Sequence, residues 1–228
     1  MNFQGKIGFC IGPDFQRNQN ENIFERMRQI GTPAMSDGIN KFNTVSPDIK
    51  PVIEGCCIAG RAVTLRLRGA DNLMLHKCIG CLQKNDVLVI DTCCTWNYSV
   101  LGELIATAAF RQGIAGIIVD GGIRDIRDLK KARMPIFART VTPAVGDKDG
   151  PGEINRPISC GGVPVLPGDY IVADDNGIVV VPSDMIEEVL EAAEKKIQSD
   201  EKRRIQIEEG VLVKPEIDNT LKAKGVLL

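Results

Sequence analysis

The stretch that decides the fold covers residues 113–125 and reads Gly-Ile-Ala-Gly-Ile-Ile-Val-Asp-Gly-Gly-Ile-Arg-Asp. This pattern predicts a tight glycine turn, a short apolar strand that ends at Asp120, a glycine-rich turn and the start of a helix. Residues 86–91, Asp-Val-Leu-Val-Ile-Asp, form a second apolar strand ending in an acid, and residues 102–109 between the two strands are predicted to be helical. Strand, helix and strand at this spacing indicate a βαβ unit.

The remaining sequence predicts further helices and strands around this unit. Helices are expected over residues 20–29, 33–39 and 71–83. Strands are expected over residues 51–55, 58–68, 135–139, 158–165, 169–173 and 177–181, with a loop over residues 140–156. Residues 183–210 are predicted to form one long charged helix, with Ser183 as its N-cap and Gly210 as its C-terminal stop. We therefore predict one α/β domain, with a core over residues 1–182 and a C-terminal helix and tail over residues 183–228. The apolar end of the tail is expected to pack on a neighbouring subunit.

Composition excludes several classes of protein. The chain has 228 residues, of which 43% are hydrophobic and 25% charged, and its formal net charge is −2. This balance gives no basic surface for nucleic acid or for a membrane. No apolar run approaches the roughly 20 residues needed to span a bilayer, and the N-terminal segment does not resemble a signal peptide. The sequence therefore predicts a cytoplasmic protein whose partner is a small molecule.

The histidine and cysteine content restricts the chemistry. His76 is the single histidine, so a metal site built from two or three imidazoles is excluded. The eight cysteines are expected to be reduced, and Cys78-x-x-Cys81 is the one recognisable spacing, with a redox role as the lesser alternative. No phosphate-binding glycine motif occurs. A hard divalent ion held by Asp125 and water remains open, and Mg²⁺ or Mn²⁺ fits such an oxygen-rich site.

Glu103, Arg124 and Asp125 are the main candidates for a site. The predicted fold brings them to the place where a helix begins beside the C-terminal end of a strand, which is where open α/β sheets bind ligands. The first-turn N–H groups of Leu104 and Ile105 lack intrahelical partners and suit a small carboxylate. Gly121 and Gly122 are expected to let a ligand approach the backbone.

A purely structural alternative exists for each of these residues. Asp125 could cap the helix that follows it, with Asp128 completing a capping-box-like pair. Arg124 could be a solvated surface residue, and Glu103 could complement a helix dipole.

Five segments together resemble the 4-hydroxy-4-methyl-2-oxoglutarate aldolase family, which also contains the regulator of ribonuclease E activity, RraA. They are residues 102–109 (Gly-Glu-Leu-Ile-Ala-Thr-Ala-Ala), 113–125 as quoted above, 135–139 (Pro-Ile-Phe-Ala-Arg), 161–169 (Gly-Gly-Val-Pro-Val-Leu-Pro-Gly-Asp) and 174–182 (Asp-Asp-Asn-Gly-Ile-Val-Val-Val-Pro). The likeness covers about residues 33–210. It implies a layered α/β/β/α sandwich, similar to a swivelling domain, with a C-terminal helical arm and a homotrimer or a dimer of trimers.

The resemblance also implies roles for particular residues. Gly102, Glu103, Leu104 and Ile105 match the segment that binds a pyruvyl group through backbone N–H groups. Arg124 matches the substrate-binding arginine and Asp125 the ligand of Mg²⁺ or Mn²⁺. Glu201 is the nearest match to a glutamate that reaches the active site of a neighbouring subunit in the aldolases.

The implied activity is metal-dependent cleavage of a 4-hydroxy-2-oxo-dicarboxylate to pyruvate, with decarboxylation of oxaloacetate as a side activity. The substrate would be of the 4-hydroxy-4-methyl-2-oxoglutarate or 4-carboxy-4-hydroxy-2-oxoadipate type. Two alternatives stay open: an oxo-acid decarboxylase of the same fold, and a non-catalytic protein that binds a ribonuclease. The regulator is a shorter chain without a C-terminal arm, so residues 183–228 favour the enzyme.

Three departures from the family pattern bear on the substrate. Glu103 stands where the aldolases often have Asp, and Asn85 stands where the family usually has Gly. Residues 92–98, Thr-Cys-Cys-Thr-Trp-Asn-Tyr, replace a more glycine-rich loop.

Overall fold

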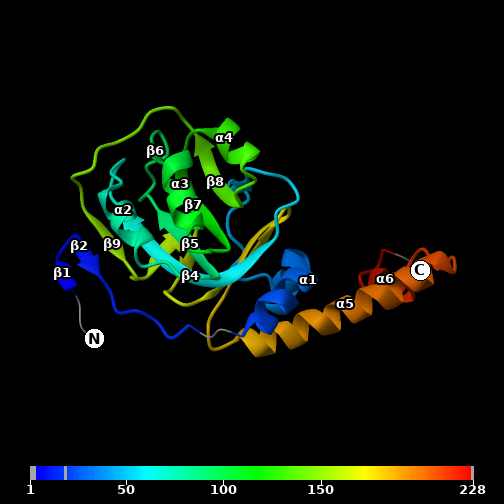
Figure 1. The fold of residues 1–228 in the computed structure, drawn as a ribbon. Helices are drawn as coiled ribbons and strands as arrows, with labels where there is room; N and C mark the ends of the chain where they lie inside the picture. The colour runs from blue at the N-terminus through cyan, green and yellow to red at the C-terminus, as the bar shows by residue number, and fades with distance from the viewer. Residues whose placement is uncertain (1–3, 18–19, 227–228) are drawn as a thin grey trace.

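The protein consists of a layered α/β core from which a long C-terminal helix projects (Figure 1). The structure is a computed structural model, and it describes residues 4–17 and 20–226. The helices are α1 (Glu21–Gly38), α2 (Leu73–Ile79), α3 (Glu103–Phe110), α4 (Ile126–Lys131), α5 (Ile186–Glu208) and α6 (Pro215–Ala223). The strands are β1 (Gln4–Lys6), β2 (Phe9–Ile11), β3 (Lys50–Pro51), β4 (Ile58–Leu67), β5 (Asp86–Asp91), β6 (Ser99–Leu101), β7 (Gly116–Ile123), β8 (Ile136–Val141), β9 (Gly152–Ile154), β10 (Ile158–Cys160), β11 (Val163–Val165), β12 (Tyr170–Asp174) and β13 (Gly177–Val181).

The main sheet is built around four parallel strands. Its order is β1-β2-β9-β4-β5-β7-β8-β3, in which β4, β5, β7 and β8 run parallel to one another. Strand β5 pairs with β7 in the register Val87 to Gly116, and α3 connects them. The predicted βαβ unit is therefore confirmed, with the short strand β6 inserted before α3 and paired to the end of β7.

Side-chain alternation in the central strands separates two cores. On β5, Leu88 and Ile90 face the cluster that includes buried residues of α2, α3 and α4, while Val87 and Val89 belong to the cluster formed with β10 to β13. Since successive side chains of a strand point to opposite faces, an uninterrupted apolar run such as residues 87–90 indicates burial on both faces.

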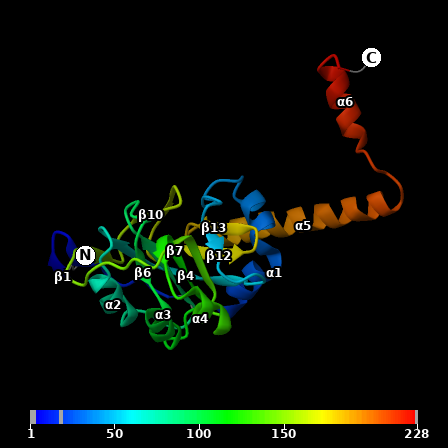
Figure 2. The same ribbon diagram turned by 90° about the horizontal axis from the view of Figure 1, so that it is seen from above.

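A third core lies on the outer face of the β12–β13 hairpin. Val172 and Val179 pack there with Met27 of α1 and Leu190 of α5. The layers are thus α2–α4, the main sheet, the β10–β13 layer and the α1–α5 pair, which confirms the expected α/β/β/α fold (Figure 2). The two β layers are continuous, because β12 pairs antiparallel with the start of β4.

Several predicted elements differ from the structure. Residues 52–55 are turn-like rather than part of a strand, and α2 ends four residues before the expected position 83. The predicted loop over residues 140–156 contains β9, whose pairing with β2 and β4 depends on chain segments far away in sequence. Ser183 does not cap α5, because α5 begins after Met185 and the Ser183 N–H donates to Asp169 Oδ1 at 3.3 Å.

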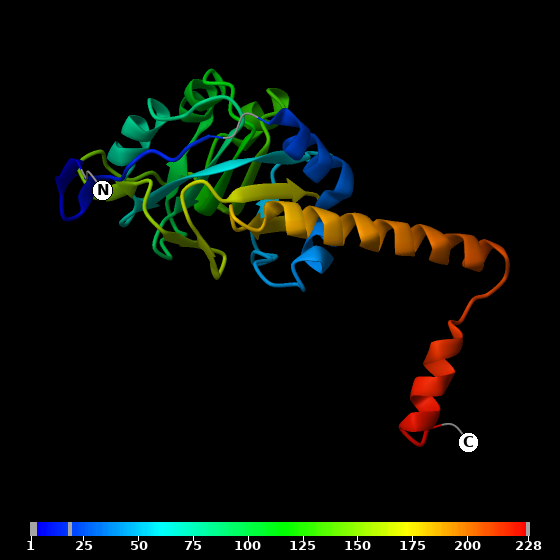
Figure 3. The ribbon, with the colours of Figure 1, turned by 90° about the horizontal axis from the view of Figure 1, so that it is seen from below.

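The long helix α5 is buried only along its first half. Its buried residues are Ile186, Val189, Leu190 and Ala193, and the remaining length extends beyond the core towards α6 (Figure 3). Within the described ranges, no helix combines the length and the apolar character needed to cross a membrane.

Candidate active site

The predicted site residues meet where α3 begins, beside the C-terminal end of β7. Strand β6 runs parallel to the end of β7, with Leu101 opposite Ile123. The Arg124 N–H donates to the Leu101 carbonyl oxygen at 3.0 Å. Gly102 follows Leu101 and Asp125 follows Arg124, so the paired strand ends hold the two segments side by side. The structure thus brings residues 102–105 next to Arg124 and Asp125.

The Asp125 carboxylate points to α3 rather than to its own helix. Asp125 has a left-handed backbone, with φ of 59°, and its side chain makes no capping hydrogen bond to α4. Instead, Asp125 Oδ2 accepts a hydrogen bond from the Glu103 N–H at 3.1 Å and lies 3.6 Å from Arg124 Nε. The alternative in which Asp125 and Asp128 cap α4 is therefore wrong.

Gly102 is required by the close approach of the two segments. A Cβ atom at Gly102 would lie 2.3 Å from Asp125 Oδ2 and 3.2 Å from Arg124 Nε. The backbone of Gly102 is extended, with φ of −131°, so other residues could adopt its conformation. The restriction at this position is therefore steric, and it comes from the acid and the arginine.

Gly121 and Gly122 have a different role from the one predicted. They lie inside β7, where the pairing with β8 shifts register between Val119 and Gly122, and not in a turn. A Cβ atom on Gly121 would lie 2.4 Å from Thr92 Cγ2, and one on Gly122 would lie 2.4 Å from the Tyr98 carbonyl oxygen. These glycines therefore make room for residues 92–98 rather than for a ligand.

The N-terminus of α3 presents free donors beside Asp125. The first hydrogen bond of the helix joins the Ala106 N–H to the Gly102 carbonyl at 3.0 Å. The N–H groups of Leu104 and Ile105 precede it and have no intrahelical acceptor. Leu104 is 80% exposed, so a ligand can reach this helix end. Helix N-termini attract anions because of these N–H groups and the helix dipole.

Glu103 is held by its own helix. Its Oε1 accepts a hydrogen bond from Thr107 Oγ1 at 2.7 Å, four residues further along α3. Thr107 was not among the predicted site residues, although the i, i+4 spacing of a glutamate and a threonine on a predicted helix is a readable signal. The hydroxyl fixes the direction of the Glu103 carboxylate.

The structure does not bring Glu201 to this site within one chain. Glu201 lies in the exposed second half of α5, where it pairs with Arg204 one turn away. Any role for Glu201 at the candidate site requires a second copy of the chain.

The residues present fit a hard divalent ion better than a soft one. The described residues contain no cluster of three His, Cys, Asp or Glu side chains that could form a closed metal cage. Asp125 supplies one carboxylate, and its side chain is 40% exposed. Mg²⁺ commonly takes one or two carboxylates and keeps several waters, whereas structural zinc needs four protein ligands.

A second group of acids at the same sheet edge serves to hold loops. Arg139 Nε donates to Asp120 Oδ1 at 2.6 Å, and Arg139 Nη1 donates to Asp48 Oδ2 at 2.8 Å. Asp91 Oδ1 accepts the Cys93 N–H at 2.7 Å, and burial raises the pKa of the Asp91 carboxyl. Asp91 ends β5 as predicted, whereas Asp120 lies within β7, which continues to Ile123 because it also pairs with β6. The pairings of both acids depend on residues distant in sequence.

Comparison with known proteins agrees with the fold. The model of the RraA-like family, described as Aldolase/RraA, matches residues 32–180. A protein of Halalkalibacterium halodurans named "Putative 4-hydroxy-4-methyl-2-oxoglutarate aldolase" is 40% identical over 187 residues, which cover 82% of this chain and 89% of that one. A Thermus thermophilus protein named 4-hydroxy-4-methyl-2-oxoglutarate aldolase is 34% identical over 124 residues, covering 54% of this chain and 75% of that one.

A solved structure shows the same architecture. Streptomyces coelicolor RraAS2, described as an unusual member of the RNase ES inhibitor RraA protein family, superimposes with a TM-score of 0.75 at 26% identity, covering 83% of this chain and 98% of that one. The chain belongs to the RraA-like family. That family includes proteins named as aldolases and proteins named as ribonuclease inhibitors.

Proposed function

We propose that the protein is a divalent-metal-dependent aldolase that cleaves 4-hydroxy-2-oxo-dicarboxylates and releases pyruvate. Substrates would be of the 4-hydroxy-4-methyl-2-oxoglutarate or 4-carboxy-4-hydroxy-2-oxoadipate type. The observation that carries the proposal is the packing of Arg124 and Asp125 against the open N-terminus of α3, with Glu103 N–H bonded to Asp125 Oδ2 at 3.1 Å. The aldolase names of relatives support it.

Asp125 would hold the divalent ion, Mg²⁺ or Mn²⁺. When bound, such an ion acts as a Lewis acid that polarises the oxygens of a 2-oxo acid. The N–H groups of Leu104 and Ile105, which have no intrahelical acceptor, would bind the substrate carboxylate. This arrangement fixes the 2-oxo acid between the helix end and the acid.

Arg124 would stabilise the charge that develops during cleavage. Breaking the bond between C3 and C4 of the substrate leaves an electron pair on the pyruvyl fragment, which is delocalised onto its 2-oxo oxygen as an enolate. A guanidinium fixed beside that oxygen stabilises the charge without reorganising. Loss of CO₂ from oxaloacetate gives the same enolate, so we expect oxaloacetate decarboxylation as a side activity.

Glu103 would handle the proton of the substrate hydroxyl. Its carboxylate, directed by Thr107, would accept that proton through a water molecule, as a general base does. The side chains of Arg124 and Asp125 are 42% and 40% exposed, which leaves the site open to a second subunit. We propose that Glu201 of a neighbouring copy completes it in a homo-oligomer, either a trimer or a dimer of trimers.

A pyruvate-release assay tests the proposal. Activity on 4-hydroxy-4-methyl-2-oxoglutarate should require Mg²⁺ or Mn²⁺ and disappear with excess EDTA. Arg124→Ala should lower kcat by about 10²–10³ on this substrate and on oxaloacetate, which is the cost of one preorganised donor. Arg124→Lys should not restore the rate fully, because an ammonium cannot reproduce the guanidinium fork.

Arg127→Ala is the matched control, since Arg127 is an exposed arginine on α4 and its replacement removes the same charge. Undiminished turnover in EDTA, or a folded Arg124→Ala variant with wild-type kinetics, would contradict the assignment.

A non-catalytic binding function is the second candidate, and the match to RraAS2 over 83% of this chain favours it. It predicts no pyruvate release from any 4-hydroxy-2-oxo acid, together with inhibition of a ribonuclease in a cleavage assay. A third outcome, activity on oxaloacetate alone, would identify an oxo-acid decarboxylase of the same fold.

A further inference from the structure

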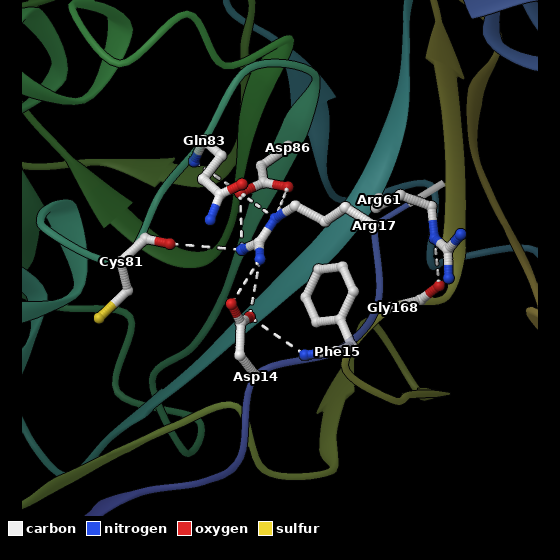
Figure 4. Close-up of polar contacts among 8 residues, drawn as sticks. All are labelled: Asp14, Phe15, Arg17, Arg61, Cys81, Gln83, Asp86 and Gly168. Atoms are coloured by element: carbon white, nitrogen blue, oxygen red, sulfur yellow. Dashed lines mark hydrogen bonds and ion pairs between the residues drawn. The ribbon is translucent and has the colours of Figure 1, made fainter. Parts of the chain in front are cut away.

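A separate pocket lies at the N-terminal ends of the parallel strands, whereas Arg124 lies at their C-terminal ends. Arg61 lies near the start of β4 and Asp86 begins β5, whereas Arg124 follows the end of β7, and these strands are parallel. The pocket has a volume of about 130 Å³, and its charged lining residues are Arg17, Glu21, Arg61, Lys84 and Asp86. Figure 4 shows the guanidinium groups of Arg17 and Arg61 on either side of the Phe15 ring.

Arg17 is engaged by two carboxylates and a backbone carbonyl. Its Nε donates to Asp86 Oδ1 at 3.0 Å, and its Nη1 donates to Asp14 Oδ2 at 2.7 Å. Its Nη2 donates to the Cys81 carbonyl oxygen at 3.3 Å (Figure 4). Arg17 therefore ties the N-terminal segment to the loop before β5, and its charge is neutralised locally.

Arg61 is buried without such a partner. It is only 8% exposed, and its Nε donates to the Gly168 carbonyl oxygen at 2.5 Å. The Tyr170 and Phe15 ring centroids lie 4.2 and 5.7 Å from the guanidinium carbon. No carboxylate of the described residues lies within 4.0 Å of the Arg61 guanidinium, although Arg17 in the same pocket has two.

A buried cation is costly unless it is compensated, and the two aromatic rings together with the charge of Asp169 supply part of that compensation for Arg61. Arg17 is neutralised by Asp14 and Asp86, so Arg61 and Lys84 are the lining cations that do not share these two carboxylates. Lys84 and Glu21 pair with each other, but their side chains remain 72% and 66% exposed, so they form a polar rim. The described residues offer no hydrogen-bond acceptor to the two Nη groups of Arg61, so these donors are open to an anion in the pocket.

We propose that this pocket binds a small oxyanion, phosphate or carboxylate, with Arg61 as its main ligand and Lys84 at the rim. A water molecule takes about 30 Å³ of liquid volume, so the cavity accommodates an ion of phosphate size. Arg61 offers two Nη amino groups in a planar fork, which suits two oxygens of one anion. This inference does not depend on the proposed aldolase function.

Isothermal titration calorimetry of the full chain, which measures the dissociation constant of each anion at constant ionic strength, tests the proposal. Inorganic phosphate and malonate are the two probes, and sodium chloride is the ionic control. We expect at least one probe to bind, and the tighter of the two identifies the phosphate or carboxylate source. Arg61→Gln should weaken that binding at least about tenfold, because it removes the charged bidentate donor. Lys84→Gln should weaken it by a smaller factor.

Arg28→Gln is the matched control, since Arg28 is an exposed arginine and its loss changes the net charge equally. Arg124→Ala separates this pocket from the candidate active site, which could also bind an anion. Binding that survives in Arg124→Ala and falls in the pocket variants supports the proposal.

Three results would overturn the proposal: no binding of either probe, equal loss in Arg28→Gln, or loss in Arg124→Ala with binding intact in Lys84→Gln. If Arg61→Gln does not fold, Lys84→Gln decides the question with Arg28→Gln as its reference. Failure of the aldolase assay would leave these outcomes unaffected.

Discussion

Gly102→Ala should disable the candidate active site while leaving the fold intact. The added Cβ would lie 2.3 Å from Asp125 Oδ2, and ordinary contact begins at 3.4 Å, so the carboxylate has to move. The displacement is about 1 Å, and a misplacement of that size in an active site can cost about 10²-fold in rate. The backbone of Gly102, with φ of −131°, accepts alanine without strain.

The same geometry bounds the effect on stability. Moving Asp125 weakens its hydrogen bond with the Glu103 N–H, which is 3.1 Å long. Because the Asp125 side chain is 40% exposed, solvent screens this interaction, and we expect a loss of no more than about 1 kcal/mol in the free energy of unfolding. The variant should therefore melt cooperatively, close to the wild-type temperature.

The assay compares Gly102→Ala with Gly80→Ala. Gly80 has φ of −72°, and a Cβ there would meet its nearest atom at 3.5 Å, so this control adds the same methyl group without a clash. Pyruvate release and the concentration of Mg²⁺ needed for half-maximal activity are measured for both variants. If Gly102→Ala keeps the wild-type rate and metal requirement, Asp125 does not act from the position seen here.

Further predictions concern titration, thiol access and packing. Burial and the charge of Lys148 lower the pKa of His76, so NMR titration of this single histidine should give a midpoint below 6.5. The neutral imidazole is the form that the fold favours. Its contribution to the free energy of unfolding is therefore present above pH 6.5 and is lost as the pH falls through the lowered pKa. Brief iodoacetamide treatment of the native protein should label Cys94 and spare Cys78, as read by mass spectrometry, because Cys94 is exposed and Cys78 is fully buried. Leu190→Ala should lower the free energy of unfolding, measured in urea, by about 2–5 kcal/mol, since Leu190 of α5 is fully buried against α1 and the β12–β13 hairpin. A loss below about 0.5 kcal/mol would contradict that packing.

The sequence by itself determined the βαβ unit and most of the elements around it. Strand β5 was predicted with the same bounds that it has in the structure, and β13 likewise, because both are short apolar runs bounded by turn residues. The break between the two predicted N-terminal helices is also present, at Gly31, where φ is 76°. Local signals of this kind act over a few residues, so they can be read from the chain directly.

The sequence also indicated which residues meet at the candidate site. Arg124 and Asp125 follow a strand and Gly102 begins a helix, and the right-handed connection between parallel strands leaves few ways to arrange such ends. The proximity of these segments follows from that topology. Their chemical roles remain a proposal.

Only the tertiary structure decided where individual side chains point. The Asp125 carboxylate bonds to α3 instead of capping α4, because its left-handed backbone turns it towards a segment 22 residues earlier. Strand β9 forms in a stretch predicted as a loop, because its partners β2 and β4 come from distant parts of the chain. Arg61 is largely buried because Tyr170 and Phe15, both far from it in sequence, pack against its guanidinium. Such contacts join residues far apart in sequence, so their energies leave no periodic pattern in the chain from which they could have been predicted.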